Sequence, residues 1–296
     1  MSDEPMTASG TLRLVWPQWQ GAQAATVAGL AAEFPFAAAR RGYAVGTAVL
    51  QAVLPPHDGP TAIVPVPMDD VDLEERDGIE AKAVVLAQLR AALELIAAHD
   101  PERILTLSGD CSVSVAPFAA LARRYGDDLA VVWIDSHPDV DTNASGYTGY
   151  HAMAVTALVG RGDADVRALL PATVPADRLA LTGLHSWGED VYPNIGAWGL
   201  TSFAPDDLRD SSRPLLDWLA GTGCSKVAVH FDVDTIDSAE VVLGLGAEPG
   251  GLTSAEVRRI VADLRGAADV VGLTIAEYLP RQAMRVAQLL DGFPLL

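Results

Sequence analysis

Residues 129–139 read LAVVWIDSHPD, so that six apolar residues run directly into two aspartates and a histidine. A short apolar run of this kind is typical of a fully buried strand in a parallel sheet. Alternate residues of an extended chain share a face, so Asp135, His137 and Asp139 point the same way. Pro138 restricts His137 to extended backbone and ends the pairing of the strand. The stretch therefore predicts a strand that presents three potential metal ligands at its carboxyl end.

Residues 226–234, KVAVHFDVD, repeat this arrangement later in the chain. His230, Asp232 and Asp234 share one face of the extended backbone. Carboxylates at this density repel one another unless a cation or protons neutralise them. Taken singly, either group is compatible with caps and loop carboxylates, but together, at one edge of a sheet, they predict a metal site. Mixed carboxylate and imidazole ligands suit Mn, Co, Ni, Fe or Zn, and the pattern does not rank these metals.

Short β-branched runs alternate with longer helical patterns along the rest of the chain, which predicts an α/β fold of βαβ units around a parallel sheet. The expected strands are 11–16, 103–107, 129–134, 179–184, 226–231 and 270–275. The expected helices are 22–41, 78–98, 113–125, 151–159, 214–219, 254–266 and 281–290, with a capping box at residues 253–256. We expect a disordered N-terminus over residues 1–10 and a single domain over 11–296, because no repeat or linker interrupts the latter.

Composition and charge exclude several classes of partner. The 296 residues include 39 acidic and 20 basic side chains, a formal net charge of −19, so no nucleic-acid partner is expected. The charge suits a cationic small molecule or a divalent metal, although solubility also accounts for it. No uncharged stretch is apolar enough to span a membrane. The two cysteines, Cys111 and Cys224, and an acidic N-terminus unlike an export signal indicate a cytoplasmic location.

The motifs that carry chemistry follow one another in a recognisable order. They are Gly109-Asp110-Cys111-Ser112, Asp135-Ser136-His137-Pro138-Asp139, His151, Asp232-Val233-Asp234 with Asp237, and Glu277-Tyr278-Leu279-Pro280. Their order and separations resemble the ureohydrolases, the family of arginase, agmatinase, guanidinobutyrase and formiminoglutamase. The resemblance implies a three-layer α/β/α fold with a mostly parallel, doubly wound sheet, and a homo-oligomer that is a trimer or hexamer. It also implies two Mn²⁺ ions and a small cationic guanidino-type substrate that is hydrolysed to urea or a urea-like product.

The same resemblance implies a ligand role for each aspartate of the two strand-end motifs. By motif match, Asp135 and Asp232 would bridge both metal ions. Asp139 would complete the first site, called site A, whereas His137 and Asp234 would complete the second, called site B.

Three residues are implied as catalytic. Asp139 would hold the attacking hydroxide and pass its proton to the leaving nitrogen. His151 stands where the family has a proton-shuttling histidine, although a lone histidine at a helix start is often only a cap. Glu277 stands where the family pairs a carboxylate with the guanidinium, although a glutamate at a strand end also caps helices.

The chain departs from the family at Cys111, which replaces a histidine ligand of site A. A buried cysteine is often an apolar filler, but a thiolate also binds metals and is softer than Mn²⁺ prefers. Fe, Co, Ni or Zn, or occupancy by a single ion, are therefore expected alternatives to two Mn²⁺. His230, where the family has a small residue, would supply the missing imidazole or support another ligand. This combination also resembles an Nω-hydroxyarginine hydrolase within the same family.

The other end of the substrate is expected to meet Ser186, Trp187 and Tyr147. Arginases have an aspartate near the position of Ser186 that holds the α-amino group, so an α-amino acid substrate is not expected. The two aromatic rings would wall an apolar pocket, or they would only pack. Two other interpretations stay open, namely a single-metal deacetylase-like amidohydrolase that uses site B and a non-catalytic relative that has lost site A.

Overall fold

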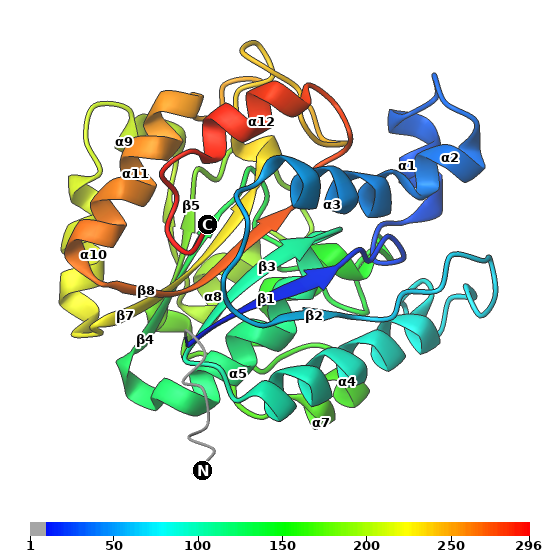
Figure 1. The fold of residues 1–296 in the computed structure, drawn as a ribbon, viewed down its shortest axis with the longest axis horizontal. Helices are drawn as coiled ribbons and strands as arrows, with labels where there is room; N and C mark the ends of the chain where they lie inside the picture. The colour runs from blue at the N-terminus through cyan, green and yellow to red at the C-terminus, as the bar shows by residue number, and fades with distance from the viewer. Residues whose placement is uncertain (1–9) are drawn as a thin grey trace, which may run out of the picture.

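The centre of the computed structural model, which describes residues 10–296, is an eight-stranded parallel sheet (Figure 1). The strands lie in the order β2-β1-β3-β8-β7-β4-β5-β6. They span β1 Thr11–Trp16, β2 Thr61–Ile63, β3 Arg103–Ser108, β4 Leu129–Ile134, β5 Leu179–Thr182, β6 Thr201–Phe203, β7 Lys226–Asp232 and β8 Asp269–Ala276. Because every pairing is parallel, all eight carboxyl ends lie at one edge of the sheet.

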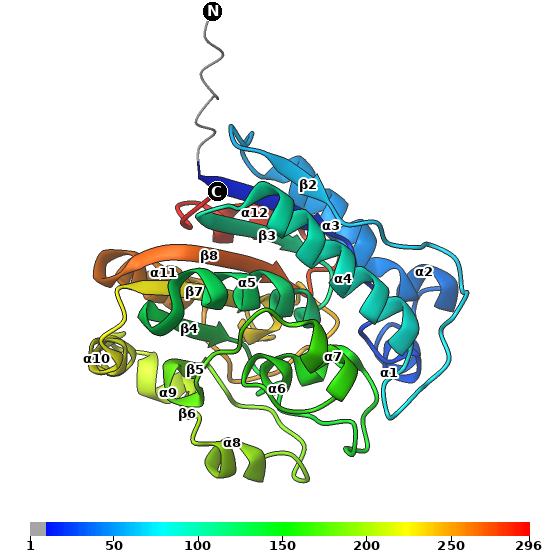
Figure 2. The ribbon, with the colours of Figure 1, turned by 90° about the horizontal axis from the view of Figure 1, so that it is seen from below.

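Helices cover both faces of this sheet and give three layers (Figure 2). They are α1 Ala24–Leu30, α2 Phe36–Arg40, α3 Gly42–Val53, α4 Lys82–His99, α5 Val115–Tyr125, α6 Ala154–Leu158, α7 Ala164–Leu169, α8 Pro193–Trp198, α9 Pro205–Leu208, α10 Arg213–Thr222, α11 Ser254–Ala267 and α12 Ala283–Leu290. No helix within residues 10–296 combines the length and apolar character needed to cross a membrane.

Two hydrophobic cores lie on opposite faces of the sheet. The core beneath α4, α5 and α6 contains Val131 and Trp133 of β4, whereas the core beneath α3, α10, α11 and α12 contains Val132 and Ile134 of the same strand. This alternation follows from the two-residue period of a strand. It also explains why β4 is apolar throughout, since both of its faces are buried. The expected three-layer α/β/α fold is confirmed.

All six strands predicted from the sequence are present, and β2 and β6 are additional. β5 ends at Thr182, before the predicted residue 184, because Gly183 adopts a φ of 88° that leaves the extended region. The additional strands have only three residues each and lie at the two edges of the sheet. Such short edge strands have no local pattern strong enough to predict them.

The helix predicted over residues 22–41 is wrong, because the chain forms two helices there. α1 ends at Leu30 and α2 begins after Pro35. Pro35 has no N–H to donate to a carbonyl oxygen of the preceding turn, so it cannot continue a helix. Proline also disfavours helical backbone at the residue before it, Phe34, which explains the break. The next helix, α3, was not predicted, since its glycines lower the helix propensity of residues 42–53.

The remaining helices depart from the prediction mainly at their ends. α4 begins at Lys82 rather than 78, and the predicted helix at 151–159 begins as a 3₁₀ turn over Tyr150–Met153. The capping box of α11 is confirmed, with the N–H of Glu256 donating to Thr253 and that of Thr253 donating to Glu256. α7, α8 and α9 are short helices that were not predicted. Residues 1–9 of the expected N-terminal segment lie outside the described residues.

α3 lies directly against the chain that leaves β8. A Cβ atom at Gly46 would lie 1.7 Å from the carbonyl oxygen of Tyr278, so only glycine allows this approach. The neighbouring Thr47 hydroxyl donates to the carbonyl oxygen of Ser108 at 2.8 Å, which fixes α3 to the end of β3. These contacts bring Tyr43, one turn earlier in α3, into the cavity described below.

We predict opposite effects for two glycine-to-alanine substitutions in helices. Gly46→Ala should lower the free energy of unfolding by about 1–3 kcal/mol, because the added methyl group overpacks the contact with Tyr278. Gly221→Ala in α10, where a Cβ meets no atom within 4 Å, should raise it by about 0.5–1 kcal/mol. Urea denaturation of both variants measures the difference, and equal stabilities would contradict the packing described for α3.

Candidate active site

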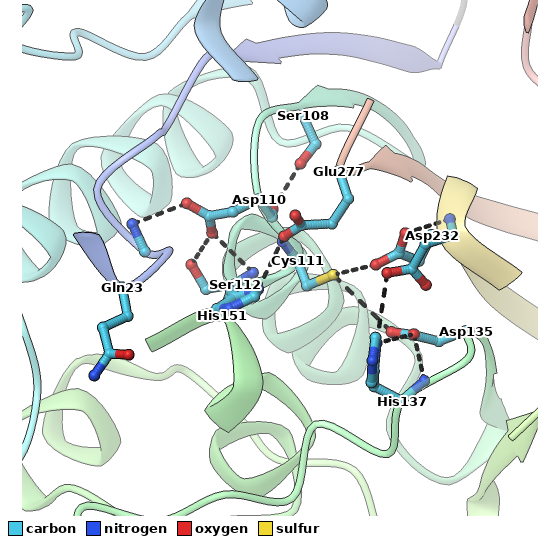
Figure 3. Close-up of polar contacts among 12 residues, drawn as sticks. Gln23, Ser108, Asp110, Cys111, Ser112, Asp135, His137, His151, Asp232 and Glu277 are labelled. Carbon is cyan, nitrogen blue, oxygen red and sulfur yellow. Dashed lines mark hydrogen bonds and ion pairs between the residues drawn. The ribbon is translucent and has the colours of Figure 1, made fainter. Parts of the chain in front are cut away.

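Four neighbouring strands in the middle of the sheet end at one place. β3, β8, β7 and β4 lie side by side, and the residues at or just beyond their carboxyl ends include Cys111, Glu277, Asp232 and Asp135 (Figure 3). The register pairs Asp232 with Ala276, which directly precedes Glu277. Parallel pairing therefore brings together side chains that are far apart in the sequence. Ligand sites of doubly wound sheets occur at this edge.

One group of potential metal ligands consists of Asp135, His137 and Asp234. Their ligand atoms lie within 4.8 Å of one another. The His137 Nδ1 atom is 3.6 Å from Asp135 Oδ1 and 3.5 Å from Asp234 Oδ2. The Ser136 hydroxyl donates to Asp234 at 2.6 Å, and the N–H of His137 donates to Asp135 at 2.7 Å, so both carboxylates are held in place.

A second group shares Asp135 with the first and adds Cys111, His230 and Asp232. The Cys111 thiol donates to Asp232 Oδ2 at 3.0 Å, and its sulfur lies 4.0 Å from Asp135 (Figure 3). The N–H of Asp234 donates to the other oxygen of Asp232 at 2.8 Å. Burial raises the pKa of the Cys111 thiol well above its usual range, and the charge of Asp232 adds to the effect. Asp135 is therefore the residue common to both groups.

His230 is completely buried and is held on two sides. Its ring stacks on Trp133 with centroids 3.6 Å apart and planes 8° from parallel. Its Nδ1 atom lies 2.8 Å from the Ser114 hydroxyl, whereas Nε2 has no hydrogen-bond partner within residues 10–296 and lies 3.9 Å from Asp135 Oδ2. Burial lowers the pKa of His230 to about 4, so the ring is neutral. A neutral imidazole is the form that binds metals.

Asp139 belongs to neither group, although it lies beside them on the cavity wall. It is 4% exposed, and its Oδ2 atom has no hydrogen-bond partner among the described residues. Its backbone φ is 49°, and that of Glu277 is 62°, a conformation that residues other than glycine rarely adopt. Strained backbone of this kind concentrates at functional sites.

Negative charge exceeds positive charge in this centre. Burial raises the pKa of Asp139 and of Asp232 well above the usual range, and neighbouring carboxylates raise both further. Burial likewise raises the pKa of Asp234 to about 6. Burial alone would lower the pKa of His137, but the charges of Asp234 and Asp135 outweigh it and raise the pKa to about 10. A bound cation would stabilise the ionised form of these carboxylates.

Glu277 and His151 form a separate pair on the same wall. The Glu277 Oε1 atom accepts the N–H of Cys111 at 3.0 Å and lies 3.0 Å from His151 Nδ1. Burial would raise the pKa of Glu277, but the positive charge of a protonated His151 and the hydrogen bonds that Glu277 accepts outweigh it and lower the pKa. Glu277 is therefore an ionised carboxylate fixed in position.

A cavity of about 470 Å³ opens over this centre. It is lined by most of the residues predicted from the sequence, namely Cys111, His137, Asp139, Tyr147, His151, Ser186, Trp187, Asp232, Asp234 and Glu277. The predicted ligands Asp135 and His230 are buried and do not line it. A larger hollow of about 670 Å³ lies between α4 and α5 beside the start of β3, and none of the predicted residues lines it. The chemistry of the side chains therefore identifies the smaller cavity as the candidate site.

Several residues of the site were missed from the sequence. Tyr43, Asp141, Asp190 and Glu248 also line the cavity, and Ser114 contacts His230 from below. Asp141 stands two residues after Asp139, so its position on the same loop was a usable signal. Tyr43 and Ser114 had none, because α3 and the 3₁₀ turn Cys111–Ser114 reach the site only through tertiary packing.

Asp110 acts as a scaffold. It is fully buried and accepts the N–H of Gly21 at 3.0 Å, the N–H of Ser112 at 3.1 Å and the amide of Gln18 at 3.1 Å. The chain after β1 is thereby fixed against the end of β3, beside Cys111 (Figure 3).

Comparisons with known proteins bear on the family and on the fold. A family model described as "Arginase family" matches residues 40–289. The mitochondrial arginase of Medicago truncatula is 30% identical over 217 residues, which cover 72% of this chain and 59% of that protein. The arginase of Eremothecium gossypii is 28% identical over 244 residues, which cover 76% of this chain and 61% of that protein. The chain thus spans less than two thirds of the length of these relatives.

Solved structures show the same fold. The arginase of Entamoeba histolytica in complex with L-ornithine superposes with a TM-score of 0.75 at 16% identity, covering 96% of both chains. A hypothetical agmatinase from Burkholderia thailandensis gives a TM-score of 0.64 at 18% identity, covering 94% of this chain and 82% of that one. The chain has an α/β fold with carboxylates and imidazoles at its strand ends, and the family model matches most of its length. These findings identify the class of protein. The chain belongs to the arginase family.

We predict that Asp110→Ala destabilises the protein through its hydrogen bonds alone. Each buried donor left unsatisfied should lower the free energy of unfolding by about 1–3 kcal/mol. The exposed Asp210→Ala serves as the matched control and should leave stability unchanged. Thermal or urea unfolding measures both variants, and equal stability of the two would remove Asp110 from the scaffold.

Proposed function

We propose that this protein is a metal-dependent hydrolase that cleaves a guanidino or amidino C–N bond and releases urea or a urea-like product from a small cationic substrate. One observation carries the proposal: two groups of potential metal ligands share Asp135 directly beneath a cavity whose wall presents His151 and Glu277. Membership of the arginase family supports it.

The residues present fit a pair of divalent metal ions. Asp139 Oδ2 and His230 Nε2 are buried polar atoms without a hydrogen-bond partner among the described residues. Buried polar atoms normally have a partner, and a bound cation would be the partner of these two. We infer that Asp135 and Asp232 would be shared, that Cys111, Asp139 and His230 would hold one ion, and that His137 and Asp234 would hold the other. When bound, such ions lower the pKa of water and stabilise negative charge on oxygen.

We propose Mn²⁺ as the metal, because carboxylates dominate the donor set. The softer thiol of Cys111 makes Fe, Co, Ni or Zn, or a single ion, the alternatives at site A.

Three side chains would act on the substrate. Glu277, ionised and held by the N–H of Cys111, would pair with the guanidinium and orient its carbon toward the attacking water. Asp139 would accept a proton from that water and deliver it to the leaving nitrogen. His151 would exchange protons with the site through Nδ1, the atom that faces Glu277.

Further acidic residues on the cavity wall restrict the rest of the substrate. Asp141, Asp190 and Glu248 line the cavity, and no lysine or arginine is among the described residues that do so. A carboxylate on the substrate would therefore meet like charges without a lysine or arginine to pair with. Asp190 supplies an acidic group that Ser186 lacks, so an amino group is acceptable. We infer a guanidino compound without a carboxylate, whose apolar linker would lie against Trp187 and Tyr147.

The experiment that tests the function is a screen for urea and amine release from guanidino compounds, with Mn, Fe, Co, Ni and Zn supplied in turn. We predict hydrolysis of a guanidinoalkylamine and weaker hydrolysis of L-arginine. Glu277→Gln should retain its metal but lose at least about a hundredfold in kcat/KM, because an unpaired buried charge costs about 3–5 kcal/mol. Glu189→Gln, an exposed neighbour of Asp190 outside the cavity, is the control.

Three outcomes of this screen would contradict the proposal in different ways. Preferred hydrolysis of Nω-hydroxyarginine would show that the substrate is an α-amino acid, which contradicts the inferred absence of a carboxylate. Release of acetate from acetylated amines, included in the same screen for this purpose, would favour a deacetylase. Metal binding without any hydrolysis would favour a non-catalytic relative.

A second prediction concerns the ligands that distinguish site A. Cys111→Ser should weaken binding of the ion at site A, whereas Cys111→His should strengthen Mn²⁺ binding by supplying a harder donor. If His230 already ligates, the new imidazole is crowded, so Cys111→His combined with His230→Ser should bind best, a coupling that a double-mutant cycle reveals. Bound Mn²⁺ per chain is measured for each protein, with Cys224→Ser as the control cysteine. Equal affinities throughout would leave Cys111 as an apolar filler.

A further inference from the structure

Three side chains form a continuous line of hydrogen bonds from the cavity wall to the end of β8. The Tyr147 hydroxyl lies 2.6 Å from His151 Nε2, and His151 Nδ1 lies 3.0 Å from Glu277 Oε1. Both ring nitrogens of His151 are thus occupied by side chains. The His151 side chain is 21% exposed, yet both of its nitrogens face protein side chains.

Neighbouring residues fix the position of the Tyr147 side chain. The backbone N–H of Gln23 donates to the Tyr147 hydroxyl at 3.3 Å. A Cβ atom at Gly149 would lie 2.5 Å from the Tyr147 ring, so the absence of a side chain there creates the space for the ring. The rings of Tyr147 and His151 meet at 60° with centroids 5.5 Å apart. Contacts from two separate segments therefore aim the hydroxyl at His151.

These contacts determine which nitrogen carries the proton when His151 is neutral. An ionised Glu277 only accepts hydrogen bonds, so Nδ1 must donate to it. The Tyr147 oxygen accepts from Gln23, which leaves its own hydrogen for Nε2. When His151 is charged, Nε2 donates instead, and the hydroxyl accepts. A hydroxyl is able to do both, so the contact persists in both protonation states of His151.

We propose that Tyr147 is a positioning residue that fixes the tautomer of His151 and carries protons between His151 and water at the mouth of the cavity. Its side chain is half-buried and lines the cavity. The inference rests on the proposed function, since it gives a path to the protons that His151 would exchange.

The proton transfers balance over one turnover. On the inward step, Nδ1 gives its proton to the departing amine, which has already taken one proton from Asp139 and so leaves as an ammonium. Nε2 takes the proton of Tyr147, and the hydroxyl regains one from water at the mouth. On the outward step, Nδ1 takes one proton of the next attacking water, whose other proton is the one that Asp139 later carries. Nε2 returns its proton to Tyr147, and the hydroxyl passes one to the mouth. Tyr147 and His151 both end as they began.

The test is Tyr147→Phe, which removes the hydroxyl and keeps the ring, compared with Tyr125→Phe, which removes a hydroxyl bound to Glu102 at the end of α5. The holoenzyme with Tyr147→Phe should lose about tenfold or more in kcat with KM changed little. Added imidazole or phosphate should restore kcat in proportion to its concentration, because a small acid or base replaces the missing relay. Tyr125→Phe should retain the kcat of the original protein.

A kcat for Tyr147→Phe equal to that of the original protein would overturn the proposal, and so would a loss that buffer does not rescue, since that is the signature of a merely structural role. Nitrogen NMR of the His151 ring gives a readout that does not depend on hydrolysis. The account expects a proton on Nδ1, and a clear shift of the Nε2 resonance in Tyr147→Phe. Identical His151 resonances in the two proteins would overturn the inference, whether or not any guanidino compound is hydrolysed. Failure of every guanidino compound as a substrate would refute the proposed function separately.

Discussion

Mutual repulsion among buried carboxylates is the constraint on which this site depends. Asp135, Asp139, Asp232, Asp234 and Glu277 are each less than 10% exposed, and they converge from three strands. Hydrogen bonds from backbone N–H groups and the charge of His137 offset part of the repulsion, yet the pKa values of Asp139 and Asp232 stay raised by burial. Within the proposed function, divalent cations would supply the remaining compensation, which links metal binding to the stability of this edge of the sheet.

The fold tolerates this concentration of charge because the charged side chains lie at one edge of the sheet, outside its hydrophobic cores. The central strands are mostly apolar on both faces, and the carboxylates of the site lie at or beyond their carboxyl ends. Gly46 and Asp110 bring α3 and the chain after β1 against that edge, so two distant segments close the cavity. The residues that stabilise the fold are therefore largely separate from those of the site. The cores lie on the two faces of the sheet, whereas the reactive side chains lie beyond the carboxyl ends of its strands.

Much of this arrangement could be predicted from local sequence. The strand preceding Asp135 and the strand containing His230 are continuous apolar runs, so their ends, and hence the polar residues there, were identifiable. Pro35 is likewise a local signal, for the break between α1 and α2. Tyr43 and Ser114 could not be found in this way, because only tertiary packing brings them to the site. For Tyr147, the sequence suggested a pocket wall, whereas the contact of its hydroxyl with His151 emerges only from the folded geometry.

The most direct test of the central claim is anomalous X-ray scattering from crystals of this protein grown with Mn²⁺. We expect a peak in contact with the carboxylate of Asp135 and shared with Cys111, His230 or Asp232, and a second peak that joins Asp135 to His137 and Asp234. A crystal without a peak beside Asp135, in which the Cys111 thiol still donates to Asp232, would contradict the claim that cations balance the charge of this centre.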